Sequence, residues 1–497
     1  MRSVDLVIIA LYLLAMPAVG VLLGGRQRTS QDYFVGSRRL PWWAVCFSVV
    51  ATETSTLTVI SVPTVAYLGT FSYLQLAIGY LIGRVVVAVV LLPRYYAGNL
   101  VSAYGFLGTR FGSGMQGTAS VTFLVTRLLA DGLRLFATAI PVKVMLDAIG
   151  LNTSYWQIVL GLAVLTVIYT YLGGIRAVVW VDAIQMVIYV GGAVLAAFVL
   201  AGQLPADWFG TALAEGKFQL LDFSSSPLTA KYSIFPAVLG GAVFATASHG
   251  ADQLMVQRLL SCKTLRDSQR AVIASGVVVA LQFALFLFIG TMLWSFFRGA
   301  SPSAMGMASD DELFPRFIVN QLPPGLSGLL IAGILAAAMS TLASSLNSLS
   351  TSTVSDLYRR FTRREPDDAA ILRQGKIWTL VWAVLFVALG SMFSNTENPV
   401  VEIGLEIASY TYGALLGSFL LGLLVKRARQ SDAVVAFLAT LVVVVGLLFV
   451  TFPDGKGIAF SWLTPIGVLV TLLVGGLLSL RHPRETPEGA QRAAETR

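Results

Sequence analysis

Apolar runs of about twenty residues recur along almost the whole chain, and each is long enough to cross a bilayer core of about 30 Å. Hydrophobic residues make up 56% and charged residues 12% of the 497 residues, and the mean hydropathy is +0.77. Soluble domains carry roughly twice that charged fraction. The chain is therefore predicted to be an all-α polytopic protein that crosses the lipid bilayer of the cell inner (plasma) membrane several times.

The positions of these runs predict about thirteen transmembrane helices. The first run is too long for the core of a signal peptide and lacks a small-residue cleavage site before Arg26, so it is kept as a mature helix. The predicted spans are 4–24, 44–70, 74–97, 115–149, 155–173, 178–203, 233–257, 268–298, 323–357, 373–394, 400–425, 432–452 and 459–480.

Basic residues are concentrated in alternate loops between the predicted spans, such as the loop after the first span and the arginine-rich loop at 359–364. This pattern follows the positive-inside rule and places the N-terminus outside and the C-terminus in the cytoplasm. The net charge of +8 is therefore explained without nucleic-acid binding. With only two histidines, the sequence does not favour a histidine-built metal or haem site.

One predicted span contains an unusual polar stretch, Val49–Pro63. Polar groups in lipid need internal partners or a water-filled cavity. Thr and Ser compete with the helix for backbone hydrogen bonds, and Pro63 removes a donor. The stretch predicts a helix broken near the membrane centre, with freed carbonyls that can hold a cation. A continuous helix that packs through small polar residues is the other interpretation. The polar residues are Thr52, Glu53, Thr54, Ser55, Thr56 and Thr58.

A second break is predicted five helices later, at Gly240, Gly241 and the polar run 248–253. Two interrupted spans at corresponding positions indicate an inverted repeat with a binding site between its halves, 44–203 and 233–425. Such repeats are typical of secondary transporters, so a transport core is predicted over 44–425. It follows a leading helix and cytoplasmic loop (1–43) and precedes two trailing helices (426–482) and a polar tail (483–497) that is predicted to be disordered.

Helix 323–357 offers oxygen ligands for a cation. Its residues Ala337, Ser340, Thr341 and Ser344 are spaced i, i+3, i+4, i+7 and share one face. Two hydroxyls beside a small residue can complete the shell around a sodium ion whose other ligands are carbonyls near Ala51 and Thr54. Neutral oxygens suit sodium, because a proton would need a titratable group. A small-residue packing face is the alternative.

Several charged residues fall inside apolar spans, where charge is costly and is usually paired. Asp131 and Arg134 are three residues apart and can pair along one helix. Glu53 is predicted to pair with Arg84 or with Arg134.

Near the first break, the candidates for binding a solute are Ser55, Thr58 and Gln75. Arg134 joins them if the solute is anionic, and on the sequence alone this role and a structural pairing with Asp131 remain equally open.

Several segments occur in the order found in one family of carriers. They are Asp32–Trp43, the hydroxyl-rich stretch, Tyr171–Gln185, Gln257–Arg258, Ala337–Ser348 and Tyr410–Gly413. In these segments the chain resembles the sodium:solute symporter family, which includes proline, sialic acid, pantothenate and sodium/glucose carriers. The resemblance implies a LeuT-type 5+5 inverted repeat and alternating access driven by the sodium gradient.

The resemblance also implies site residues. The main sodium site would use the backbone carbonyls of Ala51, Thr54 and Ala337 with the hydroxyls of Ser340 and Thr341. By comparison with sialic acid carriers, a second sodium would use Asp182 and Ser344, although Ala343 stands where such carriers have a serine. Arg134 resembles the position from which sialic acid carriers bind the substrate carboxylate.

The predicted function is sodium-coupled symport that imports a small polar organic solute, and the chain is not predicted to be an enzyme. No GxxxxGK[ST] motif is present, so an ion gradient is expected to supply the energy. The alternative is a transporter-like sensor or channel without coupled uptake. A sensor usually carries a soluble output domain, and the residues after Pro483 are too few to form one. No obligatory protein partner is evident.

Overall fold

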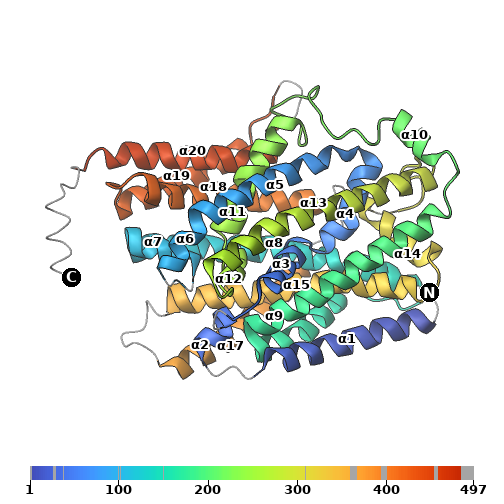
Figure 1. Ribbon diagram of the computed structural model, residues 1–497, viewed down its shortest axis with the longest axis horizontal. Helices are drawn as coiled ribbons and strands as arrows, with labels where there is room; N and C mark the ends of the chain where they lie inside the picture. Colours follow the sequence, from blue (N-terminus) through green and yellow to red (C-terminus); the bar gives the residue numbers. More distant parts are fainter. Residues whose placement is uncertain are drawn as a thin grey trace.

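The computed structural model describes residues 3–25, 29–36, 39–98, 100, 102–148, 150–307, 309–358, 367–392, 400–452 and 457–482. Within these ranges the fold is built of helices, and the only β-type pairings are two isolated bridges. The long helices lie alongside one another in a bundle (Figure 1). Helix α1 begins at the right-hand end of this view and α20 ends at the left-hand end.

The first half of the bundle leads from the N-terminus to the longest helix. Its elements are α1 (Ser3–Gly24), α2 (Ser30–Val35), α3 (Trp42–Glu53), α4 (Thr56–Leu68), η2 (Phe71–Tyr73), α5 (Leu74–Val86), η3 (Val87–Leu91), α6 (Leu92–Ala97), α7 (Ala103–Phe111), α8 (Ser113–Ala148) and α9 (Tyr155–Ala201).

The second half begins with a short helix in a connecting segment. Its elements are α10 (Trp208–Ala214), η4 (Pro236–Gly240), α11 (Gly241–Gly250), α12 (Gln253–Leu259), α13 (Leu265–Phe296), η5 (Asp310–Glu312), α14 (Leu313–Gln321), α15 (Leu326–Ser352), η6 (Thr353–Tyr358), α17 (Asp368–Gly390), α18 (Val400–Leu424), α19 (Gln430–Leu447) and α20 (Phe460–Ser479).

Nine helical segments in the described part are long and apolar enough to cross a membrane, or ten if α3 and α4 form one bent span. The predicted count of thirteen also requires α8, the α11–α12 segment and each half of α9 to be spans. That count and the inverted-repeat layout therefore stay predictions. Helix α8 is about 54 Å long at 1.5 Å per residue, so its length permits a tilted crossing.

Helix α9 contains a sharp kink at Gly174. This residue has φ 56° and ψ −158°, which a residue with a side chain rarely adopts. A Cβ atom at Gly174 would lie 2.8 Å from the carbonyl oxygen of Tyr33, so the glycine also permits α2 to approach closely. The kink falls between the two spans that the sequence predicted here.

The first predicted break is present between α3 and α4. Thr54 (φ −79°, ψ 80°) and Ser55 (φ −76°, ψ 172°) are not helical, and the two helices are bent by 58°. The Ser55 N–H bonds the carbonyl of Glu53 at 3.0 Å, so it does not continue the helical ladder to Ala51. Pro63 lies inside α4 and is not part of the break. The hydroxyl-rich residues rather than the proline interrupt this helix.

The second predicted break is present between α11 and α12, within the run 248–253, whereas Gly240 and Gly241 keep helical backbone angles and are not part of it. Ala251 (φ −122°, ψ −5°) and Asp252 (φ −98°, ψ 124°) leave the helix, and the Asp252 side chain caps α12 by accepting from Leu254 N–H at 2.8 Å. The cap satisfies one of the N–H groups that a helix start leaves open. The broken helix therefore restarts from a buried aspartate.

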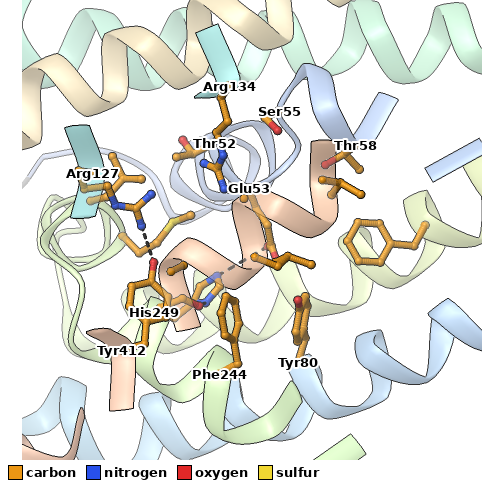
Figure 2. Close-up of a pocket in the computed structure, with 18 of the residues that line it drawn as sticks. Thr52, Glu53, Ser55, Thr58, Tyr80, Arg127, Arg134, Phe244, His249 and Tyr412 are labelled. Carbon is orange, nitrogen blue, oxygen red and sulfur yellow. Dashed lines mark hydrogen bonds and ion pairs between the residues drawn. The ribbon is translucent and has the colours of Figure 1, made fainter. Parts of the chain in front are cut away.

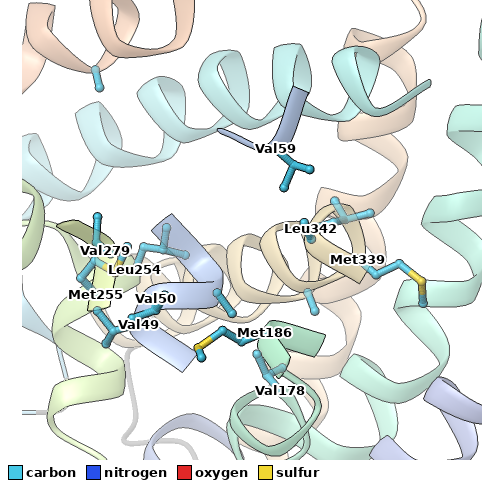
Figure 3. Packing of buried hydrophobic residues seen from close by; sticks show 14 of the residues in the cluster. Val49, Val50, Val59, Val178, Met186, Leu254, Met255, Val279, Met339 and Leu342 are labelled. Atoms are coloured by element: carbon cyan, nitrogen blue, oxygen red, sulfur yellow. The ribbon is translucent and has the colours of Figure 1, made fainter. Parts of the chain in front are cut away.

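Helix α15 forms the centre of the bundle. Nearly all of its residues are buried, and it packs extensively against α9. Figure 3 shows Leu342 of α15 below Val59 of α4, and Val49 and Val50 of α3 beside Leu254 and Met255 of α12. This apolar packing holds the first break against the middle of α15.

Candidate functional site

A cavity of about 70 Å³ lies between the two broken segments. Figure 2 shows side chains from both breaks and from α8 turned toward it. Aromatic side chains and ionised groups share its wall, a combination suited to a small polar solute. Its lining comprises Thr52, Glu53, Ser55, Thr58, Tyr73, Tyr80, Arg127, Arg134, Phe244, Ser248, His249, Leu254, Met255, Phe283, Val401, Gly404, Leu405, Ala408 and Tyr412.

Glu53 is the last residue of α3 and forms an ion pair with Arg84 of α5. The arginine side chain is completely buried, whereas 15% of the glutamate side chain is exposed. Arg84 also donates to the Ser275 hydroxyl at 3.0 Å. The predicted pairing of Glu53 with an arginine is confirmed, and Arg84 is the partner.

Arg127 on α8 holds the second break in place. It forms an ion pair with Asp252 and donates to the hydroxyl of Tyr412 on α18 at 2.5 Å. The Tyr412 hydroxyl in turn donates to Asp252 at 2.7 Å. These side chains join α8, the start of α12 and α18 at one edge of the cavity (Figure 2).

Arg134 lies two turns further along α8 and pairs with Asp131 at 3.2 Å, as the spacing predicted. Asp131 also accepts from the Ser345 hydroxyl at 2.5 Å and lies 3.6 Å from Arg127. This carboxylate is therefore shared between two guanidinium groups. Arg134 keeps 18% of its side chain exposed, and its Nε makes no hydrogen bond within the described residues.

Three of the four predicted solute-binding residues line the cavity, namely Ser55, Thr58 and Arg134. Gln75 does not. Its amide donates to the carbonyls of Ser72 and Tyr232 at 3.1 and 2.7 Å. The structure thus places Gln75 in a contact between η2 and the segment before α11, away from this wall.

The predicted main sodium ligands lie where the first break meets α15. The Thr52 hydroxyl is 3.4 Å from that of Ser344, and the Thr56 hydroxyl donates to the carbonyl of Ile334 at 3.2 Å. These two contacts set the break antiparallel to α15. They bring Ala51 and Thr54 alongside the stretch of α15 that carries the other three predicted ligands, and all five residues are buried.

The hydrogens of the two α15 hydroxyls already have acceptors. Ser340 donates to Asp182 at 2.6 Å, and Thr341 donates to the carbonyl of Ala337 at 3.1 Å. A hydroxyl has two acceptor lone pairs besides its hydrogen. Both oxygens therefore keep lone pairs that can serve as neutral cation ligands.

The residues predicted for a second sodium surround Arg258 of α12. Asp182 accepts from the hydroxyls of Ser48 and Ser340, each at 2.6 Å, and lies 3.4 Å from Arg258. The guanidinium also donates to the Ser344 hydroxyl. The structure thus brings Asp182 and Ser344 together, around a fixed positive charge that belongs to the protein.

The sequence reasoning did not assign a role to Arg127, Phe244, His249 or Tyr412, which line the cavity. Arg127 lies four residues before Asp131, a spacing that predicts pairing on one helix face. That signal was available. The positions of Phe244 and His249 depend on the packing of α11 against α5, which no local pattern predicts.

Comparisons with known proteins support one relationship over most of the chain. The family model described as the sodium:solute symporter family matches residues 33–440. The sodium/sialic acid symporter SiaT of Proteus mirabilis (strain HI4320) is 30% identical over 475 residues, which are 93% of this chain and 92% of SiaT. The human sodium-coupled monocarboxylate transporter 1 is 28% identical over 445 residues, which are 88% of this chain and 71% of that protein.

Solved structures agree with this relationship. A substrate-bound, outward-open Na⁺-coupled sialic acid symporter has a TM-score of 0.85 and 26% identity, covering 97% of this chain and 98% of its own. A nucleobase-cation-symport-1 family transporter in a closed conformation has a TM-score of 0.59 and 13% identity, covering 92% and 97% of the two chains, and it supports the fold alone. The predicted LeuT-like, all-helical fold is confirmed at this level.

Proposed function

Because this chain belongs to the sodium:solute symporter family, we propose that it imports a small polar organic solute together with sodium by alternating access. Members of this family are transporters and not enzymes, and they use sodium. The proposal places the chain in the cell inner (plasma) membrane, with its N-terminus outside and its C-terminus in the cytoplasm. Residues 44–425 form the transport core, followed by the trailing helices 426–482.

The observation that carries the proposal is the polar cavity between the two breaks. Secondary transporters bind solute and ion near the membrane centre, where interrupted helices expose backbone groups. Arg134 reaches this cavity and shares its only ion-pair partner in the described residues, Asp131, with Arg127. A guanidinium in that position can bind a carboxylate through two parallel N–H groups. The proposed solute therefore carries a carboxylate.

The proposed main sodium site uses the carbonyls of Ala51, Thr54 and Ala337 with the hydroxyls of Ser340 and Thr341. Its support is the antiparallel contact between the break and α15 and the free lone pairs of the two hydroxyls. The site adjoins the cavity through Thr52 and Ser55. Sodium bound there would hold the two halves of the broken helix against α15, which couples ion binding to the shape of the cavity.

Uptake into membrane vesicles tests the proposed function directly. A sodium gradient is expected to drive accumulation of one member of a panel of sugars, sugar acids, amino acids and monocarboxylates above its external concentration. Collapse of the sodium gradient should abolish this accumulation. A sensor would bind the solute without accumulating it, and a channel would only equilibrate it, so either result contradicts the proposal.

Removal of either side-chain ligand is expected to weaken the main sodium site. Ser340→Ala or Thr341→Ala should raise the sodium concentration for half-maximal uptake, since loss of a buried ligand costs about 1–3 kcal/mol. Ser350→Ala is the matched control, because this buried serine on the same helix donates to Gly375 far from the break. Unchanged sodium dependence in both site variants would reject this site.

Replacement of Arg134 decides whether the solute is held by its carboxylate. Arg134→Lys keeps the positive charge but cannot bind a carboxylate through two parallel N–H groups. We expect this variant to lose high-affinity binding of anionic solutes while sodium-dependent thermal stability persists. Arg316→Lys is the control, because Arg316 pairs with Glu312 outside the cavity. If only uncharged solutes stabilise the wild-type protein, or if Arg134→Lys mainly lowers solute-free stability, Arg134 is structural.

A further inference from the structure

An imidazole and a carboxylate face each other in the cavity wall. The Nε2 atom of His249 lies 3.7 Å from a carboxylate oxygen of Glu53, which is beyond hydrogen-bonding distance. The His249 side chain is 2% exposed, and its Nε2 has no hydrogen-bond partner among the described residues. Figure 2 shows His249 and Glu53 turned toward each other, with Arg134 on the opposite side of the glutamate.

The contacts of the other ring nitrogen indicate which tautomer His249 adopts. Its Nδ1 lies 3.2 Å from the carbonyl oxygen of Ala245 and 2.8 Å from the hydroxyl of Ser248. We assign the hydrogen to Nδ1, because a carbonyl oxygen can only accept and the Ala245 contact is then a hydrogen bond. The Ser248 hydroxyl can then accept from Nδ1 and donate to Ala245, 3.3 Å away. A neutral ring with its hydrogen on Nδ1 presents an acceptor at Nε2.

The carboxylate opposite His249 is held in place from behind. Arg84 binds the same Glu53 oxygen and is completely buried, whereas the glutamate is partly exposed. The carboxylate therefore reaches the cavity and its arginine partner does not. Glu53 thus already accepts from Arg84, whereas the Nε2 atom of His249 has no partner, and a buried polar atom without a partner is costly.

We infer that Glu53 and His249 together receive a hydrogen-bond donor of the solute, a hydroxyl or an ammonium group. This inference rests on the proposed function and specifies its solute. With Arg134 binding a carboxylate, the solute is a hydroxy- or amino-carboxylate and not an unsubstituted monocarboxylate. Tyr80 and Phe244 line the cavity beside the pair and can contact the carbon skeleton between the two polar ends.

Matched probes test this inference on the full-length purified protein in sodium. The first series is butyrate, γ-hydroxybutyrate and γ-aminobutyrate, and the second contains the corresponding caproates. Sites built to bind a polar group discriminate strongly against analogues that lack it. Titration calorimetry should show a donor-bearing member of one series binding at least about tenfold more tightly than its unsubstituted parent. The better of the hydroxyl and amino members identifies the donor.

Variants at His249 assign this preference to the pair. His249→Phe keeps a ring of similar size without Nε2 and should reduce the affinity ratio of donor-bearing probe to parent acid to near one. His249→Gln keeps an acceptor on the side chain and should retain part of the preference. It also serves as the test if His249→Phe does not fold. Equal binding of parent and donor-bearing probes by the wild-type protein, or an unchanged preference in a folded His249 variant, would overturn the inference.

A probe without a carboxylate separates this inference from the proposed function. Aminobutanol carries donor groups but nothing for Arg134 to bind. If it binds the wild-type protein and His249→Phe weakens that binding, the inference holds even where carboxylates fail to bind. Carboxylate binding that does not depend on sodium would instead contradict the proposed symport. If donor-bearing carboxylates bind no better than their parent acids and aminobutanol binds the wild type and His249→Phe equally, the inference fails.

Discussion

Replacing Glu53 with glutamine is expected to lower the stability of the solute-free protein by about 3–5 kcal/mol, because the change leaves the Arg84 guanidinium buried without a counter-charge. The Ser275 hydroxyl can still accept from Arg84, but it carries no charge. Thermal unfolding of the purified protein in detergent measures the loss. The same variant should also give a lower yield from membranes.

The double variant Glu53→Gln with Arg84→Met is the informative comparison. Removing both charges should restore part of the lost stability, because a buried ion pair can often be replaced by neutral side chains of similar size. Asp147→Asn is the matched control, because its partner Lys143 is partly exposed and the pair should contribute less than about 1 kcal/mol. Normal stability of Glu53→Gln would mean that Arg84 does not depend on this carboxylate.

The broken helices could be predicted because their cause is local. Thr54 and Ser55 offer hydroxyls that compete with helical hydrogen bonds, and the structure places the break at these residues. The contribution assigned to Pro63 was wrong. This proline lies inside α4, close to Gly290 of α13. A Cβ atom at Gly290 would lie 2.1 Å from the carbonyl oxygen of Pro63, so only a glycine permits this close contact between the two helices. Whether a proline breaks a membrane helix depends on its neighbours, which the local sequence does not specify.

The partners of the buried charges were harder to predict. The spacing of Asp131 and Arg134 predicted their pairing correctly, because both lie on one helix. For Glu53 the sequence left two arginines open, and only the packing of α5 beside the break selects Arg84. Gln75 lies on the same helix as Arg84 but contacts backbone carbonyls outside the cavity. Helix periodicity predicts which residues share a face of a helix. The packing of the neighbouring helices determines which side chains that face contacts.

The Asp182 cluster shows the same limit. The family resemblance predicted a shared site for Asp182 and Ser344, and in the structure both contact Arg258, which the resemblance did not include. Arg258 directly follows the predicted span 233–257 and belongs to the Gln257–Arg258 segment of the resemblance, so the sequence predicted a loop charge there and no part in this site. In the structure it lies on α12 with 0% exposure, because the second break turns its short helix inward. The packing of α12 thus places Arg258 in the core as part of an ion pair, whereas the sequence predicted it to lie in a loop.

Asp182→Asn is therefore expected to be among the most damaging single substitutions in this chain. Both members of the Asp182–Arg258 pair are completely buried, so the variant should lose about 3–5 kcal/mol of stability by leaving the guanidinium without a carboxylate. The hydroxyls of Ser48 and Ser340 would also face an amide that accepts hydrogen bonds through only one oxygen. Thermal unfolding without sodium or solute measures this structural contribution.

The double variant Asp182→Asn with Arg258→Met separates the structural contribution from a role in sodium binding. It should recover part of the lost stability if charge pairing is the main effect. The steepness of sodium-dependent binding then tests the second sodium. A carboxylate that also binds sodium cannot be replaced by an amide and methionine, so the stabilised double variant would show a shallower dependence on sodium than the wild type. If binding by the double variant depends on sodium concentration as steeply as in the wild type, Asp182 pairs with Arg258 and does not bind sodium. Unchanged stability of Asp182→Asn would contradict the ion pair itself.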